Sequence, residues 1–164
     1  LRLATLAGIL AGLVQALGLI RWVFAVPGLA RTFADPAASE AARTAAAVAF
    51  ESLHHYAGVA LGEHLGQMGT AVWAGLLAVE LGSLPGAARW QVWLGGAAAG
   101  LIVAGLAEGF ATVVAFDPGV LGLATPVGYV ALSVWMVAVG VSFIRRRAAP
   151  AMRDTAGASG ASSV

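Results

Sequence analysis

Histidine and carboxylate residues form the most chemically capable group in this sequence. His54 and His55 stand together, and Glu63 and His64 follow after a short apolar segment. Neutral imidazole and carboxylate groups are ligands for zinc, copper, iron or manganese. Glu51 lies three residues before His54, a spacing that carboxylate-bridged di-iron bundles also use. The candidate metal ligands are therefore His64, Glu63, His54 and Glu51.

A wider set of polar residues suggests a cofactor or a lipid headgroup instead of a metal. A haem with two imidazole ligands would need His54 or His55 to face His64. A quinone or an anionic lipid would use Arg21, Trp22 and His64. These alternatives stay open, and the candidate cofactor-binding residues are Arg21, Trp22, His54, His55, Glu63, His64, Gln67 and Glu108.

The composition indicates an integral membrane protein in a lipid bilayer. Of 164 residues, 60% are hydrophobic and 10% are charged, whereas a soluble domain is about 45–50% apolar and about 25% charged. Nine arginines and eight acidic residues leave a net charge of +1, so the broad basic surface that binds nucleic acid is not expected. The lack of cysteine excludes thiolate metal sites and thiol nucleophiles.

Four apolar segments have the length of a membrane helix, about 20 residues. The short connections after the second and third segments favour antiparallel neighbours. We therefore predict an all-α transmembrane helical bundle of four spans within residues 1–147. The spans cover residues 3–26, 60–81, 92–116 and 120–144.

The segment 36–58 has a different pattern. Asp35-Pro36 is typical of a helix N-cap followed by proline at the first helical position. At 100° per residue, Glu51 and His54 lie on one polar side of this helix. The pattern predicts one amphipathic extracytoplasmic helix that lies on the membrane, caps the bundle or continues into the second span. A fifth, more polar span is the alternative.

The arginines predict the orientation. Positive charges concentrate on the cytoplasmic side of a membrane, which places both termini in the cytoplasm, in the cytoplasmic (inner) membrane of a bacterium. Residues 148–164 are small and polar, and we predict a disordered cytoplasmic tail there. The arginines on the cytoplasmic side are Arg2, Arg89, Arg145, Arg146, Arg147 and Arg153.

Four charged or imidazole side chains fall at one predicted depth. At about 1.5 Å per residue, Arg21, Glu63, His64 and Glu108 lie roughly 25–27 Å from the cytoplasmic ends of their spans. The hydrocarbon core is about 30 Å thick, so these side chains lie near the outer interface. Arg21 then either pairs with Glu63 or Glu108 as an ordinary interfacial charge, or belongs to a ligand site.

Glycines at intervals of four residues predict close helix packing. Such packing serves the chain itself, a homodimer, or docking onto another membrane subunit. The motifs are Gly8-x3-Gly12, Gly58-x3-Gly62-x3-Gly66, Gly96-x3-Gly100 and Gly105-x3-Gly109.

Recognised catalytic patterns are lacking in the sequence. It contains neither a nucleophile elbow nor a Gly-rich phosphate loop, and carboxylates at the predicted midplane, which would indicate transport, are missing. We therefore expect a non-enzymatic accessory protein that docks onto a larger membrane complex or binds a lipid-like molecule at the outer leaflet. The alternative is a redox protein that binds metal, haem or quinone through the His/Glu cluster.

Two motifs resemble a family of small actinobacterial multi-span integral membrane proteins known only as a domain of unknown function. The motifs are Arg21-Trp22-x-Phe24-x-Val26-Pro27 and Gly62-Glu63-His64-Leu65-Gly66, and the resemblance covers about residues 10–75. Family members are often longer, with more spans. The resemblance implies no activity, but it favours the segment 62–66 as part of a site.

Overall fold

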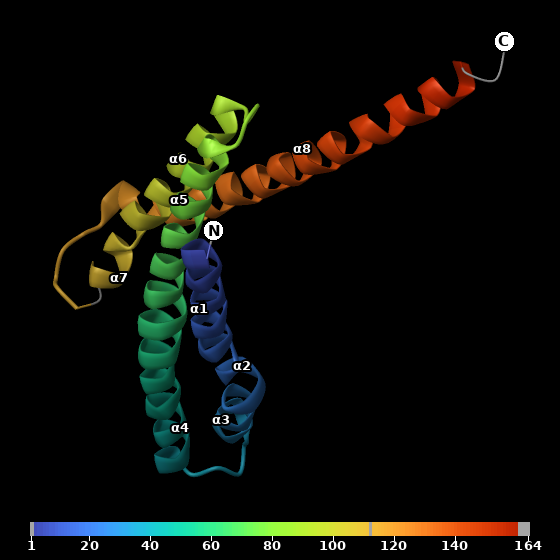
Figure 1. The fold of residues 1–164 in the computed structure, drawn as a ribbon. Helices are drawn as coiled ribbons and strands as arrows, with labels where there is room; N and C mark the ends of the chain where they lie inside the picture. Colours follow the sequence, from blue (N-terminus) through green and yellow to red (C-terminus); the bar gives the residue numbers. More distant parts are fainter. Residues whose placement is uncertain (1, 112, 161–164) are drawn as a thin grey trace.

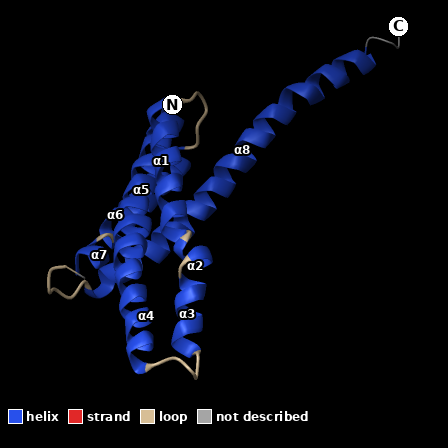
Figure 2. Ribbon diagram, turned by 90° about the horizontal axis from the view of Figure 1, so that it is seen from below, coloured by secondary structure: helices blue, strands red, loops and turns tan. Residues whose placement is uncertain are grey.

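A computed structural model describes residues 2–111 and 113–160, with side chains described as far as Arg146. The described residues form helices and connecting loops, without a strand (Figures 1 and 2). In order they are α1 (Arg2–Leu19), α2 (Arg21–Phe24), α3 (Val26–Ala34), α4 (Glu40–Leu53), the π-helix η1 (His54–Leu65), α5 (Gly66–Ser83), α6 (Arg89–Gly105), α7 (Ala107–Ala111), the 3-10 helix η2 (Gly119–Leu123) and α8 (Ala124–Gly160).

The first half of the chain is a long helical hairpin. The helices α1, α2 and α3 follow one another almost without interruption, and α4, η1 and α5 continue into one another as a single helix (Figure 1). The N-cap of α4 is Ser39, whose Oγ accepts a hydrogen bond from the Ala42 N–H at 3.2 Å. The predicted cap at Asp35 is wrong, because Asp35 ends α3 and its Oδ1 accepts from the Ala37 N–H in the turn.

Three helices in the described part of the chain are long and apolar enough to cross a membrane. They cover Arg2–Ala34, Arg89–Ala111 and Gly119–Arg146, and their length and composition indicate a helical membrane protein. The predicted span 60–81 falls within the continuous helix η1–α5, where Gln67 and Glu80 lower the mean hydropathy. A membrane crossing by that segment stays a prediction.

Each long helix packs mainly on the next. Helix α1 lies against η1 and α5, α5 lies against α6, and α6 lies against α8. Small residues dominate the core, which allows close helix approach. Its buried members are Ala71, Ala74, Ala78, Leu81, Ala98, Ala99, Ile102, Leu132 and Trp135.

A buried amide links α6 to α8. Gln91 is 2% exposed, and its Nε2 donates to the Ala138 carbonyl at 3.0 Å and to the Ser142 Oγ at 2.8 Å. Arg146 donates from α8 to carbonyls of the loop between α5 and α6. These contacts join the last helix to the rest of the fold.

The C-terminal segment differs from the sequence prediction. Helix α8 continues to Gly160, where a disordered tail over 148–164 is predicted. The alanines, arginines and methionine after Ile144 have high helix propensity and continue α8, although Pro150 and Gly157 disfavour a helix interior. Residues 161–164 lie outside the described residues.

Candidate functional site

The histidines of this sequence all lie in one unusual element. His54, His55 and His64 belong to η1, a π-helix of 12 residues, and π-helical segments are rare and frequent at functional sites. Glu63 follows His54 by nine positions, which is two and a half turns of an α-helix at about 3.6 residues per turn. The same separation is about two turns of a π-helix, because each of its hydrogen bonds reaches one residue further. The π-helix therefore brings His54 and Glu63 to one side.

Two glycines of η1 allow close approach of the N-terminal helices. A Cβ atom at Gly18 would lie 2.5 Å from the Gly62 Cα, so the α1 and η1 backbones touch there. A Cβ atom at Gly58 would lie 2.5 Å from the Arg21 Cζ. The guanidinium group of Arg21 therefore occupies the space left by the missing side chain of Gly58.

Arg21 is buried without an acidic partner. It is 8% exposed, its Nη1 donates to the Gly18 carbonyl at 2.8 Å, and its Cζ lies 5.3 Å from the Trp22 ring centroid. Its Nε has no hydrogen-bond partner, and within the described residues no carboxylate pairs with the guanidinium group. The expected pairing of Arg21 with Glu63 or Glu108 is wrong, because the guanidinium group turns toward Gly58 and the end of α1.

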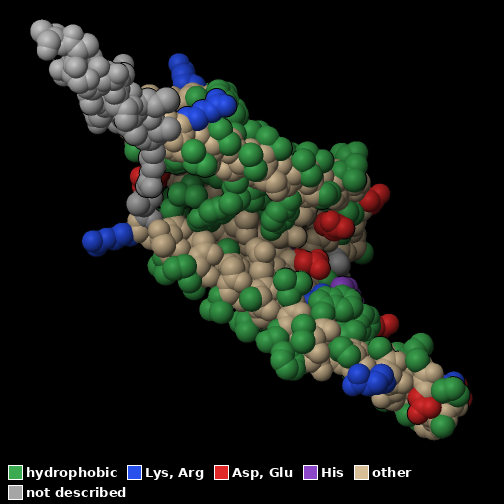
Figure 3. Space-filling view, turned by 90° about the vertical axis from the view of Figure 1, so that its right-hand side faces the viewer, with side chains coloured by type: hydrophobic (Ala, Val, Ile, Leu, Met, Phe, Trp, Pro, Cys, Tyr) green, Lys and Arg blue, Asp and Glu red, His purple; other side chains and the backbone are tan. Residues whose placement is uncertain are grey.

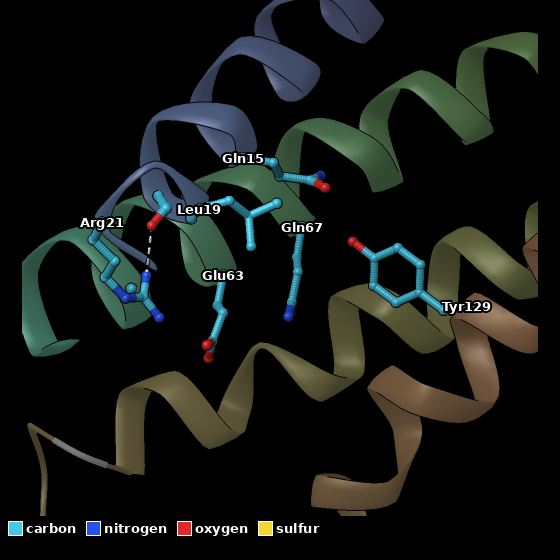
Figure 4. Close-up of a pocket in the computed structure, with 9 residues that line it drawn as sticks. Gln15, Leu19, Arg21, Glu63, Gln67 and Tyr129 are labelled. Atoms are coloured by element: carbon cyan, nitrogen blue, oxygen red, sulfur yellow. Dashed lines mark hydrogen bonds between the residues drawn. The ribbon is translucent and has the colours of Figure 1, made fainter. Parts of the chain in front are cut away.

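A cavity of about 200 Å³ lies beside Arg21, and we call it the arginine cavity. Figure 4 shows Arg21, Glu63 and Gln67 from the N-terminal hairpin and the Tyr129 hydroxyl from α8 around this space. Gln15 lines it from α1 and donates to the Thr70 Oγ1 at 2.7 Å. Positive, negative and neutral polar groups therefore meet in one small space.

A second cavity of about 230 Å³, the histidine cavity, lies between η1 and the α6–α7 junction. His54, Glu63, His64 and Gln67 line it from the long helix, and Glu108 lines it from α7. Glu63 and Gln67 line both cavities. Figure 3 shows red, blue and purple side chains gathered midway along a mostly hydrophobic face.

Aromatic contacts hold the imidazole rings. The His64 ring meets the Phe110 ring edge to face, with centroids 4.7 Å apart. His54 stacks on Phe50 at 5.9 Å, and the His54 Nδ1 is buried without a hydrogen-bond partner. His55 is exposed and contacts the His54 ring.

Two of the remaining candidates, Trp22 and Glu51, line an apolar cavity of about 440 Å³ between α3 and α4, together with Phe33 and Phe50. His55 is not part of its lining. The structure thus brings together Arg21, Glu63 and Gln67 in one cavity and His54, Glu63, His64, Gln67 and Glu108 in the next. Trp22, Glu51 and His55 line neither of these two cavities.

The predicted metal ligands do not converge. Among the described residues no group of three or more histidine and acidic side chains could hold a metal ion. Glu51 faces the apolar cavity, whereas His54, Glu63 and His64 line the histidine cavity. The side chains that line the two cavities offer hydrogen bonds and charges to an organic ligand. Within the described residues they do not form the converging set of ligands that a metal ion needs.

Three site features lie outside the predicted set. Gln15 and Tyr129 reach the arginine cavity from α1 and α8, and Gly58 provides space for Arg21. The interval between Gly58 and Gly62 is a sequence signal for packing. Nothing in the sequence indicates that an arginine fills the gap.

The fold and the site define a helical integral membrane protein with adjoining polar cavities at one end of its helical core. The chain belongs to the family described as Domain of unknown function (DUF4386), which matches residues 1–140. This confirms the resemblance to a domain of unknown function and extends it well beyond residues 10–75. No curated protein matches the chain, and no protein of solved structure matches it.

Proposed function

We propose that this protein binds an amphipathic, lipid-like molecule whose anionic headgroup pairs with Arg21. The observation that carries the proposal is the burial of the Arg21 guanidinium group, with an unpartnered Nε, beside a cavity. A buried charge without a partner costs free energy, and an anion in the cavity would remove that cost. Arginine is also well suited to bind phosphate and carboxylate groups.

The setting favours a lipid over a water-soluble anion. The cavity is bordered by Leu19 and by the apolar helices α1 and α8. We place it near the outer interface of a bacterial cytoplasmic membrane, with both termini in the cytoplasm. A lipid headgroup could reach Arg21 there while its chains stay among the lipid-facing helices.

The test is native mass spectrometry of the protein extracted in mild detergent and titrated with phosphatidylglycerol. Arg21→Gln should weaken binding more than about tenfold, because hydrogen bonds to charged groups contribute about 1.5–3 kcal/mol. The matched control is Arg31→Gln, since Arg31 is exposed on α3. Equal binding by wild type and Arg21→Gln would overturn the proposal.

The same spectra address the other functions expected from the sequence. Co-purified subunits or a doubled mass would support an accessory subunit or a homodimer. A stoichiometric mass surplus of haem, quinone or metal would support redox chemistry in the histidine cavity. His64→Ala should then remove that surplus.

A further inference from the structure

We infer that the preferred headgroup is a zwitterion that carries a phosphate and a primary ammonium, as phosphoethanolamine does. The inference rests on the proposed function and names the ligand class of that site. The phosphate would contact Arg21 in the arginine cavity, and the ammonium would contact Glu63 and Glu108 in the histidine cavity. The two cavities share Glu63 and Gln67, so one small headgroup can extend from one to the other.

The distribution of charge carries the argument. Arg21 supplies one positive charge to the arginine cavity, Glu63 supplies a negative charge to both cavities, and Glu108 supplies a second one to the histidine cavity. Neither carboxylate forms an ion pair or hydrogen bond within the described part of the chain. A purely anionic headgroup at Arg21 would be repelled by Glu63, and a purely cationic one would be repelled by Arg21. A zwitterion places its negative group near Arg21 and its positive group near the carboxylates, so both interactions are attractive.

The hydrogen-bonding groups favour a primary ammonium over a quaternary one. A primary ammonium has three N–H donors, and the histidine cavity offers acceptors from Glu63, Glu108 and the Gln67 side chain. A quaternary ammonium has no N–H donor and is recognised by cages of aromatic rings. The lining of this cavity contains imidazoles, but no tyrosine, tryptophan or phenylalanine within the described residues.

Polar donors are also placed for the phosphate. Arg21 lines the arginine cavity, and its Nη2 forms no hydrogen bond within the described residues. The Tyr129 hydroxyl points into the same cavity (Figure 4). Gly58 and Gly62 line the same cavity. The phosphate end thus has a charged donor and a neutral donor on opposite walls.

The experiment compares three lipids with one water-soluble probe on the full chain. Phosphatidylethanolamine, phosphatidylcholine and phosphatidylglycerol are titrated in nanodiscs of matched acyl chains, and glycerophosphoethanolamine is titrated without lipid. Wild type should bind phosphatidylethanolamine at least fivefold more tightly than the other two lipids. Glu108→Gln should reduce that preference to less than twofold, and Glu40→Gln, an exposed change on α4, should leave it intact.

The outcomes separate this inference from the proposed function. If Arg21→Gln weakens all three lipids and wild type shows no preference for phosphatidylethanolamine, the zwitterion is overturned and lipid binding stands. If Arg21→Gln changes none of the affinities, lipid binding at Arg21 fails and the zwitterion fails with it. Glycerophosphoethanolamine binding as tightly as the lipid would support the zwitterion and contradict the lipid. Glu63→Gln should also reduce the preference for phosphatidylethanolamine. This variant provides the check if Glu108→Gln fails to fold.

Discussion

Two buried polar side chains, Gln91 and Arg21, show how the two ends of this molecule differ. Gln91 is 2% exposed, and its amide joins α6 to α8 through two hydrogen bonds. Arg21 is 8% exposed, carries a full charge, and donates one hydrogen bond to the Gly18 carbonyl. Both lie at helix–helix contacts, but the charged one has the fewer partners.

The difference separates a polar group that stabilises the fold from one that is available to a ligand. A buried polar group with its hydrogen bonds made contributes to stability, whereas an unpartnered charge costs free energy. The Trp135 Nε1 in the core is also without a partner, but it is neutral and costs less. Three predictions test this contrast, beginning with the contact that positions Arg21.

The largest effect is expected for Gly18→Leu. The new side chain would meet the Gly62 Cα and the Ala57 carbonyl at 2.5 and 2.8 Å from its Cβ, so α1 must separate from η1. We expect a loss of about 3 kcal/mol in the free energy of unfolding, measured by tryptophan fluorescence during thermal unfolding in detergent. Gly12→Leu is the control, because a Cβ there meets nothing within 4 Å. Equal loss in both variants would contradict the close contact.

The next prediction gives opposite signs for the two polar residues. Gln91→Leu should lower the free energy of unfolding by about 1 kcal/mol, because it removes two hydrogen bonds, and should leave lipid binding unchanged. Arg21→Met should raise the free energy of unfolding of delipidated protein by about 1 kcal/mol, because it removes a buried, unpaired charge. Lipid binding should then be lost. Destabilisation by Arg21→Met in delipidated protein would show that Arg21 holds the fold as Gln91 does.

The smallest effect on stability is expected for Gly58→Ala. The added methyl group would displace the guanidinium group of Arg21, which lies at the end of a flexible side chain. The free energy of unfolding should change by less than about 0.5 kcal/mol, because alanine has the higher helix propensity. Lipid affinity should fall about tenfold in the same titration. Gly100→Ala, which meets nothing within 4 Å, should leave the affinity as it is.

The sequence was sufficient to predict the helical class, and several of the candidate site residues lie together in the structure. Hydropathy identifies the apolar helices because a bilayer requires about 20 apolar residues per span. Helical rise alone brings Arg21, Glu63, His64 and Glu108 to one level, and all four line the two adjoining cavities. Their depth in a membrane stays a prediction, because it depends on how the helices cross the bilayer.

The rotation of side chains around the helix could not be predicted in the same way. A period of 100° per residue places Glu51 and His54 about 60° apart on one side of an α-helix, yet Glu51 lines the apolar cavity and His54 lines the histidine cavity. The chain becomes a π-helix at His54, so α-helical counting does not apply from there to Glu63. The turn of Arg21 toward Gly58 depends on how closely α1 approaches η1, which a single sequence does not record.

The continuous helix from α4 through η1 to α5 also has a mechanical consequence. At the α-helical rise of about 1.5 Å per residue it would be roughly 66 Å long, about twice the thickness of a hydrocarbon core. Its backbone contact with Gly18 falls at Gly62, near its midpoint. Beyond Gly62 the helix is packed between α1 and α6, whereas α4 packs on α3. Because kinks in helices occur at π-helical segments, we expect the long helix to bend within η1, so that the hairpin of α3 and α4 tilts while α5 keeps its place in the core.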